Sequence, residues 1–258
     1  MGRLVILSGP SCVGKGPLYA ALRKFYPHVA GQLTKLVLYD SRAPRPGEAD
    51  GVDFYFRTRA EIEDLRGREN FTVFEVRGDL QALDTRALEQ NLAASDVFFD
   101  GNPFIGSGLL DFVAKHGTQC LSIFLSPLSR EEVLEFRAPG RTISLPVLLT
   151  DMMRRKLLRR TTKHKGILSL RDLENIEVRA TSAYGELQQA WRFDHVIANH
   201  DGEDSENWDA FYYPVGDARQ ALRAFAGLLE GKESTHAEKW EQDLVPFEPT
   251  RTSRTSGT

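Results

Sequence analysis

The sequence contains few cysteines: Cys12 and Cys120 are the only two among 258 residues. Two cysteines cannot form a disulfide network, so the chain has to be stabilised by a packed core, for which it is long enough. So few cysteines also favour a reducing compartment, and we predict the cytoplasm. The six histidines show no metal-ligand spacing with these cysteines, so we predict no structural zinc site.

Long apolar runs and an excess of basic charge are missing as well. No stretch approaches the ~20 apolar residues of a membrane helix. The opening MGRLVILSGPS is apolar only briefly before it reaches glycine, so we expect no signal peptide. Lys plus Arg number 33 and Asp plus Glu number 36, a net charge of −3. We therefore expect neither a membrane nor a nucleic-acid partner.

Short apolar runs alternate with helical patterns along most of the chain. Runs of this kind, bounded by turn residues, are typical of buried parallel strands. The alternation predicts an α/β fold with a mainly parallel core sheet flanked by helices. Strands are predicted at residues 4–7, 35–39, 52–56, 71–76, 97–99, 121–125 and 195–198. Helices are predicted at 15–25, from 58, from 84 to 94, from 149 to 191 with a break near Gly166, and at 218–229.

The last part of the chain has a weaker pattern. After Gly231 the periodicity fades, and the final RTSRTSGT contains no core-forming residue. We expect a single domain over residues 1–230 and a mobile tail over 231–258.

A phosphate-binding loop is predicted directly after the first strand. The segment GPSCVGKG matches G-x-x-x-x-G-K and opens the first helix, which is the context this motif requires. Backbone N–H groups and the helix N-terminus would surround phosphate oxygens, and Lys15 would reach the β and γ phosphates of a nucleotide. The predicted ATP-binding residues are Gly9, Pro10, Ser11, Cys12, Val13, Gly14, Lys15 and Gly16.

The end of this loop departs from the usual motif. Gly16 stands where a Ser or Thr normally supplies a Mg²⁺ ligand, and Pro17 lacks a backbone donor, although proline is tolerated in a first helical turn. We expect the loop to bind phosphate but to hold the metal differently or more weakly. Cys12 is either a small residue in a tight loop or a thiol whose pKa the helix N-terminus lowers.

Two arginines stand three residues apart in a proline-stiffened segment. In SRAPRPGEADGVDFYF, Arg42 and Arg45 can form a forked clamp on a phosphate. This segment, about thirty residues after the phosphate loop, resembles guanylate kinase, and the resemblance covers residues 3–230. Weaker matches follow in family order, at FEVRGD, VFFD, LSIFLSP, VRATSAYGEL and DHVIAN.

The resemblance implies an ATP-dependent nucleoside monophosphate kinase with a P-loop kinase fold. A small subdomain, about residues 33–95, would hold the acceptor, and a lid, about 130–180, would bring arginines over the transferring phosphoryl group. Guanylate kinases move the γ-phosphoryl of ATP to GMP or dGMP with Mg²⁺. Positioning and charge neutralisation supply most of the catalysis in such chemistry.

The resemblance also implies roles for single residues. Arg42 and Arg45 match the acceptor-phosphate arginines, and Arg179 matches a lid arginine that contacts the phosphates. Asp100 matches an acidic residue near the metal or the acceptor, and it is the one metal ligand suggested, while Asn102 replaces a second aspartate. Asn199 matches an asparagine near the donor adenine.

The positions that read guanine differ from the family. The family glutamate is Thr72 here, with Glu75 nearby as a substitute if the strand slips, and two serines become Leu38 and Leu83. Two tyrosines on the acceptor phosphate become Phe54 and Gln81. A site that loses its hydrogen-bonding groups loses discrimination, so the true acceptor stays open. The predicted acceptor-binding residues are Arg42, Arg45, Phe54, Thr72, Glu75, Gln81 and Asp100.

A strongly basic stretch, MMRRKLLRRTTKHK, occupies residues 152–165. It is either part of a lid that clamps phosphates, a solvated helix face, or a surface that binds nucleic acid. The net negative charge of the chain makes the nucleic-acid surface the least favoured of the three. Because the sequence around it differs from the family, the lid arginine that reaches the phosphates could be Arg141, Arg159 or Arg160.

Other functions remain open at this stage. A kinase of the same fold could act on another phosphorylated acceptor, such as a sugar bisphosphate, because the base positions are rewritten. A guanylate-kinase-like domain without catalysis could bind protein partners, as Gly16 and Pro17 suggest. The intact loop from Gly9 to Lys15 favours the enzyme, whose partner would be a small phosphorylated molecule. The oligomeric state cannot be predicted.

Overall fold

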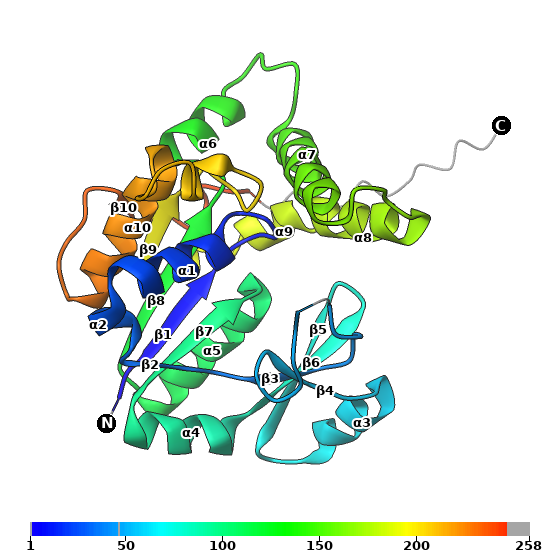
Figure 1. Cartoon of the computed structure of the whole chain (residues 1–258), viewed down its shortest axis with the longest axis vertical. Coiled ribbons are helices and arrows are strands. Elements are labelled where there is room, and N and C mark those ends of the chain that lie inside the picture. Colours follow the sequence, from blue (N-terminus) through cyan, green and yellow to red (C-terminus); the bar gives the residue numbers. More distant parts are fainter. Residues whose placement is uncertain (1, 46, 247–258) are drawn as a thin grey trace.

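The structure, a computed structural model, describes residues 2–45 and 47–246 (Figure 1). Its larger sheet has six strands in the order β10-β9-β8-β1-β7-β2. All neighbouring pairs are parallel except β9 and β10, so the mainly parallel core sheet predicted from the sequence is confirmed. The strands are β1 (Leu4–Ser8), β2 (Leu33–Lys35), β7 (Asp96–Gly101), β8 (Cys120–Ser126), β9 (His195–Ala198) and β10 (Ala237–Glu238).

Helices cover both faces of this sheet because the side chains of each buried strand alternate between them. In β1, Val5 and Leu7 pack with helices α1 and α10, whereas Leu4 and Ile6 pack with α5 on the opposite face. Figure 1 shows α1 and α10 on one side of the sheet and α5 on the other. The flanking helices are α1 (Lys15–Phe25), α2 (Pro27–Ala30), α4 (Thr85–Ala94), α5 (Pro103–His116) and α10 (Gly216–Leu229).

A second sheet of four strands lies within the predicted acceptor subdomain. Its order is β4-β3-β6-β5, and α3 (Arg59–Glu63) and the 3₁₀ helix η1 (Asp64–Gly67) accompany it. Thr58 begins α3 with the capping box that its spacing to Glu61 predicts. The strands are β3 (Leu38–Asp40), β4 (Phe54–Phe56), β5 (Phe71–Val76) and β6 (Asp79–Asp84).

The strand predicted over residues 35–39 is wrong as a single element. The structure divides it into β2, which pairs with β7 in the large sheet, and β3, which pairs with β4 and β6 in the small one. The apolar run continues across the division, so its composition gives no sign of the change of sheet. Strand β6 and helix α5 are further elements that the sequence prediction omitted.

The predicted lid region consists of helices that lie above the small sheet in Figure 1. The long helix α7 ends at Lys165, and Gly166, with φ of +72°, marks the predicted break before α8. None of the helices in residues 2–45 and 47–246 has the length and apolar character needed to cross a membrane. The remaining helices are α6 (Arg130–Arg137), α7 (Leu145–Lys165), α8 (Leu170–Thr181), α9 (Ala183–Leu187), η2 (Ala190–Arg192) and η3 (Glu206–Trp208).

The segment that follows α10 packs against the domain. The mobile tail predicted over residues 231–258 is therefore wrong for its first part, residues 231–246. β10 adds an antiparallel edge to β9, and Trp240, Leu244 and Val245 are buried. Arg137 donates hydrogen bonds to the carbonyls of Asp243 and Leu244. Three well-spaced apolar side chains suffice to anchor a segment that has no periodicity. Residues 247–258 of the predicted tail lie outside the described part of the chain.

Candidate functional site

The phosphate loop connects β1 to α1, as the motif predicts. Gly14 is the residue before the helix and has a φ of +103°. A Cβ at this position would lie 2.6 Å from the Asn199 amide nitrogen and 2.8 Å from the Asp201 carbonyl, so only glycine fits. Lys15 Nζ donates to the carbonyls of Gly9 at 2.8 Å and Pro10 at 3.0 Å. Burial lowers the pKa of Lys15, which indicates a cation held where little water stabilises it.

Cys12 is the small residue in a tight loop, and not an activated thiol. Its side chain is 1% exposed and belongs to the hydrophobic core. Burial, followed by the charge of Glu203, raises the pKa of the Cys12 thiol to about 12. A thiol with such a pKa stays protonated at neutral pH, so the alternative of a lowered pKa is wrong.

The two clamp arginines differ in how well they are paired. Arg42 makes a bidentate ion pair with Glu48, at 2.6 and 2.8 Å, and lies over the rings of Phe54 and Phe56. The Arg45 guanidinium is 4.0 Å from Glu48, beyond hydrogen-bonding distance. Burial and the charge of Arg42 lower the pKa of Arg45. Arg45 is therefore a half-exposed cation at the cavity that makes no side-chain hydrogen bond to a carboxylate in the described part of the chain.

Arg179 reaches the phosphate loop from helix α8. Its Nε donates to the Ser11 hydroxyl at 3.0 Å. Burial, and then the charges of Arg45, Arg160 and Arg77, lower the pKa of Arg179 to about 9. Such crowding of cations is unfavourable unless an anion occupies the space between them.

The structure distinguishes the three candidate lid arginines. Arg160 lines the cavity beside the phosphate loop and is 2.9 Å from Glu203. Arg159 is 74% exposed, and Arg141 pairs with Glu135 on the surface. Of the three, Arg160 alone lies with the other phosphate-site residues.

These side chains converge on one cavity of about 220 Å³ between the phosphate loop, the small sheet and the lid. It lies at the carboxyl ends of parallel strands, where α/β proteins bind their ligands. Six cationic side chains line it, against three carboxylates, so the cavity is suited to a polyanion. The cations are Lys15, Arg42, Arg45, Arg77, Arg160 and Arg179, and the carboxylates are Glu48, Asp100 and Glu203.

Asp100 and Asn102 stand at the end of β7. Burial raises the pKa of Asp100 to about 6, although the charge of Lys15 acts in the opposite direction. Asn102 is the N-cap of α5, where its side chain accepts a hydrogen bond from the Phe104 N–H. Its amide also donates to Glu186 at 3.0 Å. Asp100 is thus a carboxylate in the cavity, and Asn102 has a structural role beside it.

The wall of the small sheet offers few groups that could read a base. Phe54 and Gln81 line the cavity, and Gln81 donates to the buried Asp40 at 2.6 Å. Thr72 is exposed and lies outside the residues that line this cavity. Leu38 and Leu83 are each 2% exposed and belong to the core.

Glu75 cannot replace the missing glutamate. Strand β5 pairs with β6 in a regular register, so Glu75 lies opposite Leu80. Leu80 belongs to the cluster on the far face of the small sheet, with Ile62 of α3. Because side chains alternate along a strand, Glu75 points away from the cavity, and its expected substitution for the guanine-reading glutamate is wrong.

Asn199 supports the backbone of the phosphate loop through hydrogen bonds. It is fully buried, and its amide donates to the carbonyls of Val13 and Asp201, both at 2.7 Å. It does not line either cavity described here. The structure therefore gives Asn199 a role in shaping the loop, and its position near the donor adenine stays a prediction.

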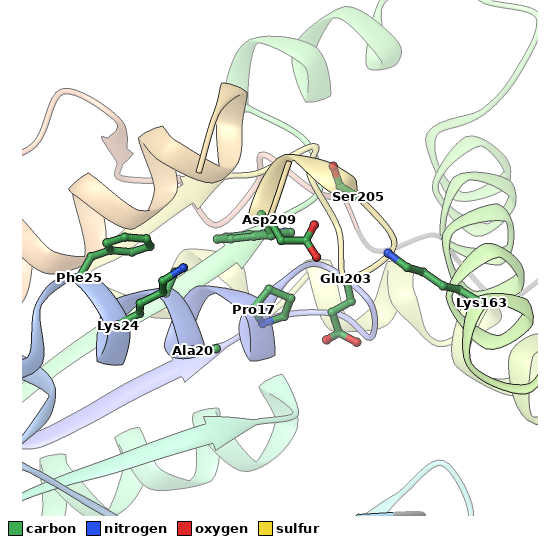
Figure 2. Close-up of a pocket in the computed structure, with 10 residues that line it drawn as sticks. Pro17, Ala20, Lys24, Phe25, Lys163, Glu203, Ser205 and Asp209 are labelled. Carbon is green, nitrogen blue, oxygen red and sulfur yellow. The ribbon is translucent and has the colours of Figure 1, made fainter. Parts of the chain in front are cut away.

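A second cavity, of about 290 Å³, opens beside the first turns of α1 (Figure 2). Figure 2 shows Lys24 and Phe25 of α1 at one end, and Lys163 of α7 with Glu203 and Ser205 at the other. Trp208 also lines it, and its Nε1 donates to the carbonyls of Asp201 and Gly202. Glu203 lines both cavities, which places them side by side around the phosphate loop.

Two residues of this region are not identified by the sequence analysis. Arg77 lies in the matched segment FEVRGD, and Glu203 follows DHVIAN. The sequence favours a packing role for Trp208, whereas the structure places it at the wall of the second cavity. Arg77 bonds a residue 109 positions away. Glu203 pairs with Arg160, from which α8, α9, η2 and β9 separate it in the sequence. A basic residue at a glycine turn is the only local signal that could have identified Arg77.

Known proteins agree with this architecture. A family model described as guanylate kinase matches residues 1–137. The guanylate kinase of Synechococcus sp. (strain JA-3-3Ab) is 31% identical over 217 residues, or 83% of each chain. That of Bartonella quintana (strain Toulouse) is 29% identical over 239 residues, 90% of this chain and 91% of the relative.

The fold also matches a solved structure. The crystal structure of guanylate kinase from Anaplasma phagocytophilum superposes with a TM-score of 0.51 at 20% identity, and the match covers 92% of this chain and 89% of that one. The family model matches more than half of the chain, and the phosphate loop and the small sheet follow in the expected order. The chain therefore belongs to the guanylate kinase family.

Proposed function

We propose that the protein transfers the γ-phosphoryl group of ATP to a nucleoside monophosphate, with GMP or dGMP as the acceptor. The observation that carries this proposal is the set of six cations around the 220 Å³ cavity. Among the described residues, the Arg45 and Arg179 side chains have no carboxylate within hydrogen-bonding distance. Phosphate groups satisfy such cations. The experiment that tests the proposal is ADP formation from ATP in the presence of each acceptor.

Four of the six cations of the cavity have a role in the proposed transfer. Lys15 exchanges the carbonyls of Gly9 and Pro10 for the β and γ phosphates of the donor. Arg42 and Arg45 hold the acceptor phosphate, and Arg179, already in contact with the phosphate loop, neutralises charge on the group in transit. Catalysis then consists of positioning and electrostatic stabilisation.

The carboxylates of the cavity fit Mg²⁺, which prefers oxygen ligands and binds through one or two carboxylates and substrate phosphates. Asp100 would hold the ion, with Glu203 as the other carboxylate near the donor side. Mg²⁺ would neutralise phosphate charge in the transfer. No group of three or more His, Cys, Asp or Glu side chains suited to a metal occurs in residues 2–45 and 47–246.

Replacing Gly16 by serine should restore the missing hydroxyl ligand. A Cβ at this position meets nothing within 4 Å, so the side chain fits. We expect the Mg²⁺ concentration for half-maximal rate to fall about fivefold, the effect of roughly 1 kcal/mol. Calorimetric titration with Mg²⁺–ADP should show the same gain. Gly16→Ala is the control, and equal behaviour of the two variants would mean that the metal is already fully held.

The second cavity is suited to the nucleoside part of the donor. A nucleotide whose phosphates lie on the loop from Gly9 to Lys15 passes Pro17 and enters this cavity, where the ring of Trp208 offers a stacking surface.

Trp208→Ala should therefore raise the KM for ATP about tenfold, because base stacking on an aromatic ring contributes roughly 1–3 kcal/mol. The KM for the acceptor should change little. Trp208→Phe keeps a ring and should retain most of the affinity. Steady-state kinetics at varied ATP concentration measure the KM for ATP in both variants. An unchanged KM for ATP in Trp208→Ala would mean that the adenine base binds elsewhere.

A second acceptor class is favoured by one observation. The positions that would read guanine carry the exposed Thr72 and the buried Leu38 and Leu83. A kinase of this fold acting on a phosphorylated sugar would keep Arg42 and Arg45 and would need no base-reading group. An acceptor panel separates this candidate from GMP.

A further inference from the structure

Arg77 is a cation of the phosphate cavity that the proposed roles leave unused. It occupies the two-residue turn between β5 and β6 together with Gly78, and both residues have positive φ, +56° and +88°. Turns of this geometry favour Asn, Asp or Gly, whereas arginine is an unfavourable residue at the first position. The local backbone therefore gives no reason for an arginine here, and the reason has to lie in its side chain.

The guanidinium of Arg77 is fixed by a buried carboxylate. Its Nε donates to Glu186 Oε1 at 2.8 Å and to the Ser182 hydroxyl at 3.0 Å, and Nη2 also donates to Glu186 Oε1. Glu186, on α9, is fully buried and accepts a further bond from Asn102. Its Oε2 is buried with no hydrogen-bond partner among the described residues. An ion pair to a buried carboxylate that has an unsatisfied oxygen contributes little to the stability of the fold. Orienting the Arg77 guanidinium explains the presence of this pair better.

Arg77 keeps donors that are not used within the protein, and it lines the cavity. Arginine has five N–H donors, and Arg77 uses two of them on Glu186 and Ser182, so three are without a partner in the described residues. Arg77 lines the cavity together with Lys15, and its charge is among the causes, after burial, that lower the pKa of Lys15 and Arg179. Arg77 thus combines three donors that have no partner in the described residues with a place in the wall of the cavity in which the proposed transfer occurs.

We propose that Arg77 is a further phosphate-binding residue of the transfer reaction, and that Glu186 is the positioning residue that holds its guanidinium in the cavity. The inference rests on the proposed function. Because Glu186 follows the helix that carries Arg179, the pair also joins the acceptor hairpin to the lid arginine. Arg77 would contact oxygens of the acceptor phosphate or of the group in transit.

The test compares variants that remove the guanidinium without disturbing the turn. Arg77→Asn supplies a residue that the turn prefers, and Arg77→Asn combined with Glu186→Gln also removes the carboxylate that would be left unpaired. Arg59→Ala is the matched control, because Arg59 donates to the Gly78 carbonyl of the same turn from the exposed side. Thermal melting confirms that each variant is folded.

We expect kcat/KM to fall roughly 10- to 100-fold in both Arg77 variants, the effect of one charge-assisted hydrogen bond. Arg59→Ala should retain the wild-type value. Free guanidinium at non-denaturing concentration should restore part of the rate of Arg77→Asn. Glu186→Gln alone should lower kcat without rescue by guanidinium, because Arg77 is still present but is no longer oriented.

Two outcomes separate this inference from the proposed function. If the wild type transfers phosphoryl and Arg77→Asn matches it in kcat and in both KM values, the inference is wrong and the proposed function stands. If the wild type shows no transfer to any acceptor, calorimetric titration with inorganic pyrophosphate decides. Weaker binding by Arg77→Asn, by about tenfold, would support the phosphate contact, and equal affinity would overturn it.

Discussion

Lys15→Ala should lower kcat about 10³-fold, the range observed when a preorganised charge is removed from a transferring phosphoryl group. Lys15 is the cation at the start of α1, and its Nζ is bonded to carbonyls of the phosphate loop, within reach of any phosphate bound there. No other side chain of the loop from Gly9 to Gly16 carries a charge, so the loop itself offers no replacement for Lys15. Since burial lowers the pKa of Lys15, its removal should not reduce the melting temperature.

Single-turnover kinetics with saturating ATP and acceptor measure this effect on the chemical step. Arg23→Ala is the matched control, because Arg23 is an exposed cation in the last turn of the same helix. It should retain the wild-type rate. A Lys15→Ala protein with full activity would exclude the loop from Gly9 to Lys15 as the site of the transferred phosphate.

Arg179→Ala should lower kcat by about 10²- to 10³-fold with little change in the KM for ATP, because the charge that it neutralises is greatest in the transition state. Arg179 lies 3.0 Å from the Ser11 hydroxyl and is crowded by Arg45, Arg160 and Arg77. This repulsion destabilises the ligand-free protein, so the alanine variant should melt at the same temperature or a higher one.

The control for this variant is Arg171→Ala, an exposed arginine on the same helix. Arg179→Lys keeps the charge but loses the planar fork, and it should recover only part of the rate. Equal losses of kcat in Arg179→Ala and Arg171→Ala would assign the effect to the stability of α8 and not to phosphate contact.

Local signals were sufficient for much of the fold. The phosphate loop, α1 and the capped starts of α3 and α4 depend on residues within a few positions of each other, and the structure agrees with their predicted bounds. The resemblance placed Arg42, Arg45 and Arg179, and the structure brings all three to one cavity.

Features that depend on contacts between residues far apart in the chain could not be predicted from the sequence. The run at residues 35–39 changes sheets without a change of composition, and the packing of Trp240 depends on contacts far along the chain. The sequence allows Glu75 to substitute for the family's guanine-reading glutamate if the strand slips, but the register of β5 with β6 fixes the face on which Glu75 lies. Partners more than 100 residues apart, as in the Arg77–Glu186 pair, leave no local pattern.

The most direct test of the proposed kinase is ADP formation from Mg²⁺–ATP with a panel of acceptors: all nucleoside and deoxynucleoside monophosphates and several sugar phosphates, each compared with Lys15→Ala. We predict ADP formation with GMP or dGMP that depends on Lys15. Turnover with a sugar phosphate alone would keep the phosphate clamp and contradict the nucleotide acceptor. ADP formation no greater than that of Lys15→Ala with every acceptor would contradict the kinase itself and favour a binding module.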